Sequence, residues 1–440
     1  MSSKLSPLTL YLFVFALASV PLLDLTLAAG GDPTRRDELV RFARGTQGMD
    51  SWHPMYRALR HLESESEPKS EPEPERALYP WLFFQQRVKF IYPPTSLLLL
   101  DLLPRDALQR ALNLLSWLCV VASVVASAAI LDRSLERSRF AAAGATDRAA
   151  RLAVAAALGL GFYPVVKAYT LGQMQVVVNA LFAVCVLCWQ RERKAAAGVL
   201  IALMAAVKPH YGVIALWGVL RGERRFAAAA AVAGLALVLV SVLRFGWHTH
   251  LDYLSVAAHV SRLGEAYWPN QTPNGFLHRL LGNGVSGHWD PQVYPPYHAL
   301  VHVGTLAAAA ALLAVGLWPV RSGARGGGLD VCAAALAATI ASPIAWEHHY
   351  GVLLPMFALL LPAALAAPRR GAALAVLAAA FAVAASHVHA QALLTDTPWR
   401  VLQSSLLFAA LAVLALLVRL RSVPSAGPDP PTADRRAGLL

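Results

Sequence analysis

Charged residues are scarce in this chain, and their scarcity excludes a water-soluble fold. Of the 440 residues, only 15% are charged while 57% are hydrophobic, and the mean hydropathy is +0.50. Several apolar runs approach the roughly 20 residues that cross a bilayer core of ~30 Å. The runs lie at 7–29, 107–131, 152–167, 174–190, 196–207, 209–220, 226–244, 298–318, 331–342, 350–366, 371–387 and 401–419. We therefore expect an all-α polytopic integral membrane protein with about twelve transmembrane helices.

Lys and Arg are absent from three short connections, at 168–173, 343–349 and 388–399. Basic residues gather instead in the alternate connections, as Arg133, Arg137, Arg139, Arg148, Arg151, Arg191, Arg193, Lys194, Arg221, Arg224, Arg225, Arg321, Arg325, Arg369 and Arg370. Because connections rich in Lys and Arg stay in the cytoplasm, this pattern predicts cytoplasmic termini and two long outer loops, 30–92 and 245–297. All fourteen histidines then fall on the outer side, which suggests that the chemistry is there.

The chain reads as one membrane domain, 1–424, followed by a disordered cytoplasmic tail, 425–440. Residues 93–131 hold two apolar pieces but allow one net crossing, so we expect 93–103 to form a short re-entrant or interfacial helix. The acidic, Pro-rich residues 63–75 cannot fold alone and are expected to be a flexible insertion in the first outer loop.

Cysteine is rare, and the four cysteines lie in apolar spans, so no disulfide framework is indicated. Cys185 and Cys188 would sit one helical turn apart, where small apolar packing is favoured over a redox or zinc site. Clusters of several carboxylates that would form a dedicated metal cage are also missing, so we expect neither a metal nor another cofactor. The net charge of +12 reflects the inward loops, so we expect membrane lipids and no nucleic acid as partners.

Three groups of polar residues stand where a membrane protein has no structural need of them. Trp346-Glu347-His348-His349 places two imidazoles and a carboxylate where the chain leaves a span, which is costly unless they form a site. Lys208, followed by Pro209, lies at the outer tip of a hairpin and could bind an anion such as a lipid-linked phosphate. Asp50 lies among aromatic residues near the outer surface, where a raised pKa would suit a general base.

Taken in order along the chain, these residues resemble glycosyltransferase family 87, the polyprenol-phosphate-mannose-dependent mannosyltransferases of the GT-C superfamily. Each piece is weak alone, but the ordered set is fairly specific and spans most of the chain. The matching positions are Asp50, Tyr92-Pro93-Pro94, Leu171-Gly172-Gln173, Gly198 to Lys208-Pro209, Asn270-Gln271-Thr272, Gly275, Arg279, Ser342-Pro343, Trp346, His348 and His349.

The resemblance implies a GT-C fold with its active site on the outer, periplasmic face of a bacterial plasma membrane. It implies inverting transfer of a hexose, with mannose favoured, from a polyprenyl-phosphate donor to a hydroxyl of a glycolipid or glycan acceptor. By position, Asp50 would be the catalytic base, and His349, His348 and Lys208 would bind the donor phosphate. Candidates for the substrate pocket are Tyr92, Gln173, Asn270, Gln271, Arg279, Trp346 and Glu347.

Two departures from the family pattern leave the acceptor open: Ala345 stands where Ser is common, and Gln175 where Asn is common. Another GT-C transferase is the main alternative, using an arabinose or aminoarabinose donor or a protein acceptor. A lipid transporter or flippase would more often show internal repeats, which this sequence lacks. A hydrolase or metal-dependent phosphatase using the outer histidines is the remaining alternative.

Overall fold

The computed structural model describes residues 5–12, 14–16, 33–66, 77–104, 106–136, 138, 140–290, 292–318, 327–386 and 392–421. The described residues are mostly helical and form no β-strand; the only extended pairing among them is an isolated bridge between Asn270 and Trp346. The predicted cytoplasmic tail, 425–440, lies outside the described residues.

Several described helices are long and apolar enough to cross a bilayer. Five qualify alone, namely α5 (Leu108–Glu136), α11 (Arg224–Phe245), α14 (Ala299–Leu317), α16 with its preceding turn (Glu347–Ala366) and α18 with its preceding turn (Pro398–Leu420). A sixth is formed by α6 (Ala145–Leu160) and α7 (Tyr163–Leu171), which are bent by 52°. The shorter apolar helices are α8 (Gln175–Gln190), α9 (Lys194–Val207), α15 (Gly328–Ala341) and α17 (Arg370–Ala385). The expectation of an all-α membrane protein is confirmed, whereas twelve crossings are not established.

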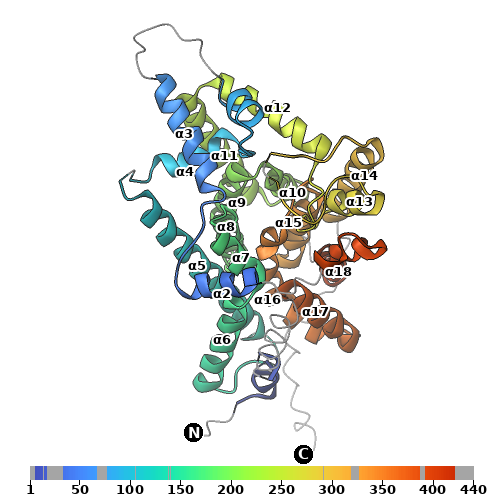
Figure 1. The fold of residues 1–440 in the computed structure, drawn as a ribbon. Coiled ribbons are helices and arrows are strands. Elements are labelled where there is room, and N and C mark those ends of the chain that lie inside the picture. The colour runs from blue at the N-terminus through green and yellow to red at the C-terminus, as the bar shows by residue number, and fades with distance from the viewer. Residues whose placement is uncertain are drawn as a thin grey trace, which may run out of the picture.

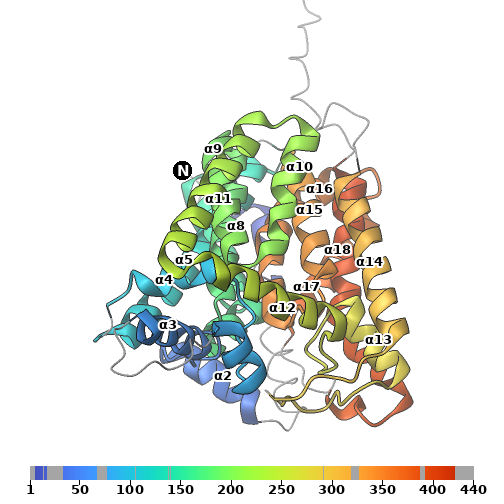
Figure 2. The same cartoon turned by 90° about the horizontal axis from the view of Figure 1, so that it is seen from above.

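The helices form two neighbouring groups. In one, α5, α8, α9 and α11 pack in succession, and in the other α14, α15, α18, α17 and α16 do so (Figure 1). The groups meet where α16 packs on α5 and where α10 (Val213–Arg221) packs on α15. Figure 2 shows α10 beside α15. Gly198 permits the close packing of α9 on α11, because a Cβ there would lie 2.2 Å from the carbonyl oxygen of Phe226.

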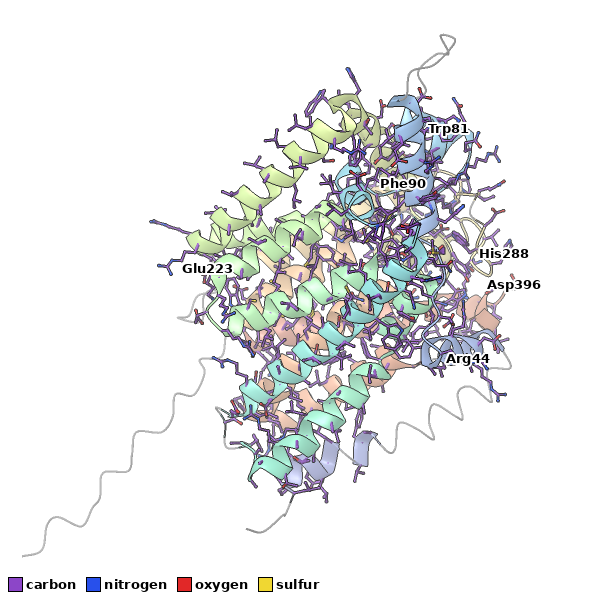
Figure 3. The ribbon with its side chains drawn as sticks, turned by 90° about the vertical axis from the view of Figure 1, so that its left-hand side faces the viewer. Arg44, Trp81, Phe90, Glu223, His288 and Asp396 are labelled. Atoms are coloured by element: carbon purple, nitrogen blue, oxygen red, sulfur yellow. The ribbon has the colours of Figure 1, made fainter. Side chains whose placement is uncertain are left out.

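The two long segments predicted to face outward gather at one end of the molecule. Trp81, Phe90 and His288 lie together at this end, and Glu223, from a basic connection, lies at the opposite end (Figure 3). The first segment folds into α2 (Pro33–Ala43) and α3 (Trp52–Ser66), and the second into α12 (Trp247–Leu263) and α13 (Pro273–Leu281). Both segments are therefore built largely of helices that cover the ends of the spans.

Two expectations for the first segment can be compared with the structure. A short helical stretch follows Pro93, with a 3₁₀ turn at Pro94–Ser96 and α4 at Leu97–Asp101, where a short helix was predicted. The expected flexible insertion 63–75 begins inside α3, because its first four residues complete that helix. A hydrogen bond from Ser64 Oγ to the His61 carbonyl oxygen, 2.8 Å long, supports this last turn. Residues 67–75 lie outside the described residues.

Candidate functional site

The loop that carries Asp50 is docked on the turn between α7 and α8. The backbone amides of Asp50 and Ser51 donate to the carbonyl oxygens of Leu171 and Gly172, at 3.0 and 3.1 Å. Gly172 has a φ of +70°, and a Cβ on it would lie 1.9 Å from the carbonyl oxygen of Gly48. Only glycine allows both this backbone conformation and this approach, so the Gly172 turn determines where Asp50 lies.

The side chain of Gln173 connects Asp50 to two buried hydroxyls. Its Nε2 donates to Oδ2 of Asp50, and its Oε1 accepts from Ser51 Oγ at 2.6 Å and from the Tyr92 hydroxyl at 3.2 Å. The two hydroxyl oxygens lie 2.8 Å from each other. Because both Nε2 and Oε1 of Gln173 are hydrogen-bonded, its side chain is held in place, and so is the Asp50 oxygen that it contacts. The other, Oδ1, has no hydrogen-bond partner within the described part of the chain.

Asp50 is held in an environment that favours a base. Burial raises the pKa of its carboxyl group above the ordinary value, while the hydrogen bond from Gln173 and the charge of Lys167 act in the opposite direction. Lys167 is itself paired with Glu38 of α2. A raised pKa makes the ionised carboxylate a stronger base than usual, which suits it to accept a proton from a sugar hydroxyl.

Lys208 is placed by the way α9 ends. Because Pro209 disfavours helical geometry at the preceding residue, α9 stops at Val207 and Lys208 is extended, with φ −135° and ψ 97°. The Ala206 carbonyl oxygen left free at the helix end accepts a 2.6 Å bond from Thr95 Oγ1. The Lys208 side chain is only 7% exposed, and its ammonium has no hydrogen bond or ion pair with any described residue. Burial of an unpaired amine is costly for its charged form, and an anionic ligand in the cavity would stabilise that form.

The two histidines of the packet differ in what their ring nitrogens contact. Both nitrogens of His348 are buried and have no partner among the residues the structure describes. Nδ1 of His349 lies 3.0 Å from the backbone amide of Trp346, which can only donate, so the proton of a neutral His349 is on Nε2. The Trp346 carbonyl oxygen, 3.2 Å from the same Nδ1, already accepts from the His349 amide at 2.8 Å. His349 is thus arranged to donate a hydrogen bond from Nε2.

Asn270, Gln271 and Arg279 hold the segment before the histidines in place. Asn270 Nδ2 donates to the Pro343 carbonyl oxygen and its Oδ1 accepts from the Ala345 amide, both at 3.1 Å. The backbone amide of Gln271 donates to the Ala345 carbonyl oxygen at 2.9 Å. Arg279 in turn donates to the Asn270 carbonyl oxygen at 2.9 Å. The hydrogen bonds of Ala345 to Asn270 and Gln271 use its backbone, and these bonds do not need a Ser side chain.

One cavity of about 450 Å³ brings most of the predicted site residues together. Its lining includes Asp50, Tyr92, Gln173, Lys208, Trp346, His348 and His349. Four predicted pocket residues lie outside the lining, namely Asn270, Gln271, Arg279 and Glu347. Glu347 is buried instead and accepts a 3.1 Å hydrogen bond from the Tyr163 hydroxyl.

The cavity also contains residues that the sequence did not single out, chiefly Lys89, Glu265, Trp289 and Tyr294. All four come from the long outer segments, where charged and aromatic residues are common, so no local pattern marked them. Within the described chain, no group of three or more His, Cys, Asp or Glu side chains is placed to hold a metal ion.

Comparison with known proteins points to one family. The model of glycosyltransferase family 87 matches residues 90–343. A Mycobacterium tuberculosis protein named polyprenol-phosphate-mannose-dependent alpha-(1-2)-phosphatidylinositol mannoside mannosyltransferase is 30% identical over 301 residues, which are 66% of each chain. A Mycolicibacterium smegmatis protein named as the corresponding phosphatidylinositol pentamannoside mannosyltransferase is 30% identical over 217 residues. This second match covers 48% of each chain, so the protein spans about two thirds of one relative and half of the other. No solved structure matches. The family model covers more than half of the sequence, and the chain therefore belongs to glycosyltransferase family 87.

Proposed function

We propose that the protein transfers mannose from a polyprenyl-phosphate donor to a hydroxyl of a glycolipid acceptor. The names of both relatives give polyprenol-phosphate-mannose as donor and a phosphatidylinositol mannoside or pentamannoside as acceptor. The observation that carries the proposal is that a single cavity joins the carboxylate of Asp50 to Lys208, His348 and His349. These are the groups needed to activate a hydroxyl and to bind a phosphate.

In the proposed reaction, Oδ1 of Asp50 takes the proton of the acceptor hydroxyl as the acceptor oxygen bonds to C1 of mannose. The bond from C1 to the phosphate oxygen breaks, and its electron pair leaves with the polyprenyl phosphate. The phosphate gains one negative charge, which the Lys208 ammonium and the His349 Nε2–H stabilise. A single displacement of this kind inverts the configuration at C1.

We place this reaction at the outer face of the plasma membrane. The cavity is lined by the outer segments, and the basic connection containing Glu223 lies at the opposite end of the molecule (Figure 3). Connections rich in Arg favour the cytoplasm, which supports an outward-facing cavity. A donor carried by a lipid suits this location, because the lipid can be moved across the bilayer.

We further propose that transfer needs no metal ion, because an ammonium and two imidazoles are at hand to stabilise the leaving phosphate. Asn270, Gln271, Arg279 and Glu347 are then positioning residues, which hold the histidine packet and do not touch the substrate. Adding EDTA should leave the rate unchanged if this is correct, and a loss of activity that divalent metal restores would contradict it.

The main test uses purified protein in lipid nanodiscs with radiolabelled polyprenyl-phosphate-mannose and a phosphatidylinositol mannoside. We expect the wild type to transfer label, and Asp50→Asn to reduce the rate at least about a hundredfold, as for loss of a general base. His349→Ala should also be slow. Asp396→Asn is the matched control, because Asp396 is exposed at the same end of the molecule and does not line the cavity (Figure 3). Full activity of Asp50→Asn would refute the base, and folded wild type without transfer would refute the function.

A further inference from the structure

The loop between α13 and α14 supplies a wall of the cavity that the proposed chemistry does not use. Trp289 and Tyr294 of this loop line the cavity together with Trp346. The rings of Trp289 and Trp346 meet edge to face, with centroids 5.6 Å apart and planes at 90°. The Trp346 ring lies 5.9 Å from that of His348. We call Trp289, Tyr294 and Trp346 the aromatic wall; it runs from the outer loop to the histidine packet.

Two polar atoms of the aromatic wall lack partners. Nε1 of Trp346 and the hydroxyl of Tyr294 are buried, and neither is hydrogen-bonded to any described residue. Buried polar groups are normally satisfied, so unpartnered donors on the side chains that line a cavity indicate a ligand. A sugar ring fits both features of the wall: its C–H face packs on an indole, and its hydroxyls accept hydrogen bonds.

Lys89 holds the loop that carries Trp289 and Tyr294. Its Nζ donates to the carbonyl oxygens of Asp290 and Val293, at 3.2 and 3.1 Å, between the two aromatic residues. The same Nζ pairs with Glu265 Oε2 at 3.1 Å, and the two side chains are only 14% and 8% exposed. Lys89 Nζ also lies 4.3 Å from the centre of the Tyr294 ring. The single partly buried ammonium of Lys89 therefore holds the segment between Trp289 and Tyr294 through two backbone carbonyls.

Asn270 connects this loop to the other half of the wall. Its Nδ2 donates to the backbone carbonyl oxygen of Glu265 at 2.8 Å and to that of Pro343 at 3.1 Å. Pro343 precedes Trp346, and Asn270 pairs with Trp346 through the isolated backbone bridge. Asn270 thus links Trp346 to Glu265, the residue with which Lys89 forms its ion pair.

We propose that the aromatic wall binds the terminal sugar of the acceptor and presents its hydroxyl to Asp50, with Lys89 as a positioning residue. This inference rests on the proposed function and names the acceptor subsite of the same cavity. Trp289 remains 37% exposed, so a sugar on it keeps a path to solvent. The acceptor needs such a path, because the rest of its glycan must leave the cavity, whereas the donor has a single sugar next to its phosphate.

The test combines binding and kinetics on the intact protein in nanodiscs. Binding of phosphatidylinositol mannoside is compared with binding of phosphatidylinositol, which has the same lipid and phosphate but no mannose. We expect wild type to prefer the mannoside. Trp289→Ala should bind it about tenfold more weakly and should raise the acceptor KM about tenfold, in line with loss of an aromatic contact. Trp289→Phe should retain most of the preference, and donor KM and kcat should not change.

Two further variants separate sugar binding from general damage. Trp399→Ala is the matched control, because Trp399 is 64% exposed and does not line the cavity; it should behave as wild type. Lys89→Met should raise acceptor KM without changing donor KM, and Lys89→Arg should restore part of the loss.

The outcomes distinguish this inference from the proposed function. A folded wild type that transfers no mannose but shows a mannoside preference dependent on Trp289 would support the subsite and refute the function. An enzyme that transfers mannose with equal acceptor KM in Trp289→Ala and wild type would overturn the subsite. So would a rise in donor KM instead, or wild type that binds both lipids equally.

Discussion

Removing the hydrogen bond from Gln173 to Asp50 should shift the pH dependence of transfer. In the proposed reaction Asp50 accepts a proton and must be ionised to do so, so we expect activity to fall as the pH drops through its pKa. Burial already raises that pKa, and the bond from Gln173 lowers it. Gln173→Leu removes the donor, so the carboxylate becomes less stable, its pKa rises further, and the acidic limb of the pH profile moves to higher pH.

The size of the shift follows from the type of bond. A hydrogen bond to a charged group contributes about 1.5–3 kcal/mol, and one pKa unit corresponds to about 1.36 kcal/mol. We therefore expect the acidic limb of kcat/KM to move up by about 1–2 pH units. Above the new pKa, the rate should recover toward that of wild type, because the base itself is still present.

Tyr92→Phe is the control for this experiment. It removes the 3.2 Å bond from the Tyr92 hydroxyl to Gln173 Oε1 but keeps the bond from Gln173 to Asp50, and Ser51 still donates to Oε1 at 2.6 Å. The acidic limb should stay where it is in wild type. An unshifted profile in Gln173→Leu, or an equal shift in Tyr92→Phe, would refute the assignment of Asp50 as the base with Gln173 as its tuning group.

Other substitutions test stability and placement. Burial makes the pKa of Asp50 higher in the folded than in the unfolded protein, so stability falls as the pH rises from the unfolded-state value through the folded-state value. Asp50→Asn removes this loss and should therefore raise the Tm at pH 8 while transfer is largely lost. Asp330 pairs with Arg221 at 2.6 Å and Arg421 at 2.9 Å, so Asp330→Asn should lower the free energy of unfolding by about 3–5 kcal/mol, and an unchanged Tm would contradict this. Gly172→Ala introduces a Cβ 1.9 Å from a carbonyl oxygen at a φ of +70°, so transfer should drop sharply, and normal activity would show that the Asp50 loop can move freely.

Much of the candidate site could be read from the sequence because its residues are costly in a membrane. Lys208, His348 and His349 stand beside apolar spans, where titratable groups need a reason to be present. Pro209 disfavours helical geometry at the residue before it, and Lys208 is extended where α9 ends. The structure then brings these residues into one cavity with Asp50.

The roles of other residues could not be read in this way. Asn270, Gln271 and Arg279 follow the family pattern, which does not separate residues that touch a substrate from residues that position others. Their buried hydrogen bonds with backbone carbonyls and with Ser404 Oγ are the basis for proposing that they belong to the second group. Trp289 was missed because an aromatic residue in a long polar segment has many possible environments.

The sequence by itself determined the membrane class, the helical fold, the family and three polar residues of the cavity lining, Lys208, His348 and His349. Composition and the spacing of apolar runs suffice for the membrane class and the helical fold, because the bilayer imposes the same length and polarity on every span. The family follows instead from the ordered motifs, and the candidate site residues from polar groups in unexpected places. Only the tertiary structure decided which oxygen of Asp50 is free and that Lys89 holds the loop of the aromatic wall. Those features depend on contacts between segments up to 204 residues apart, which local pattern does not encode.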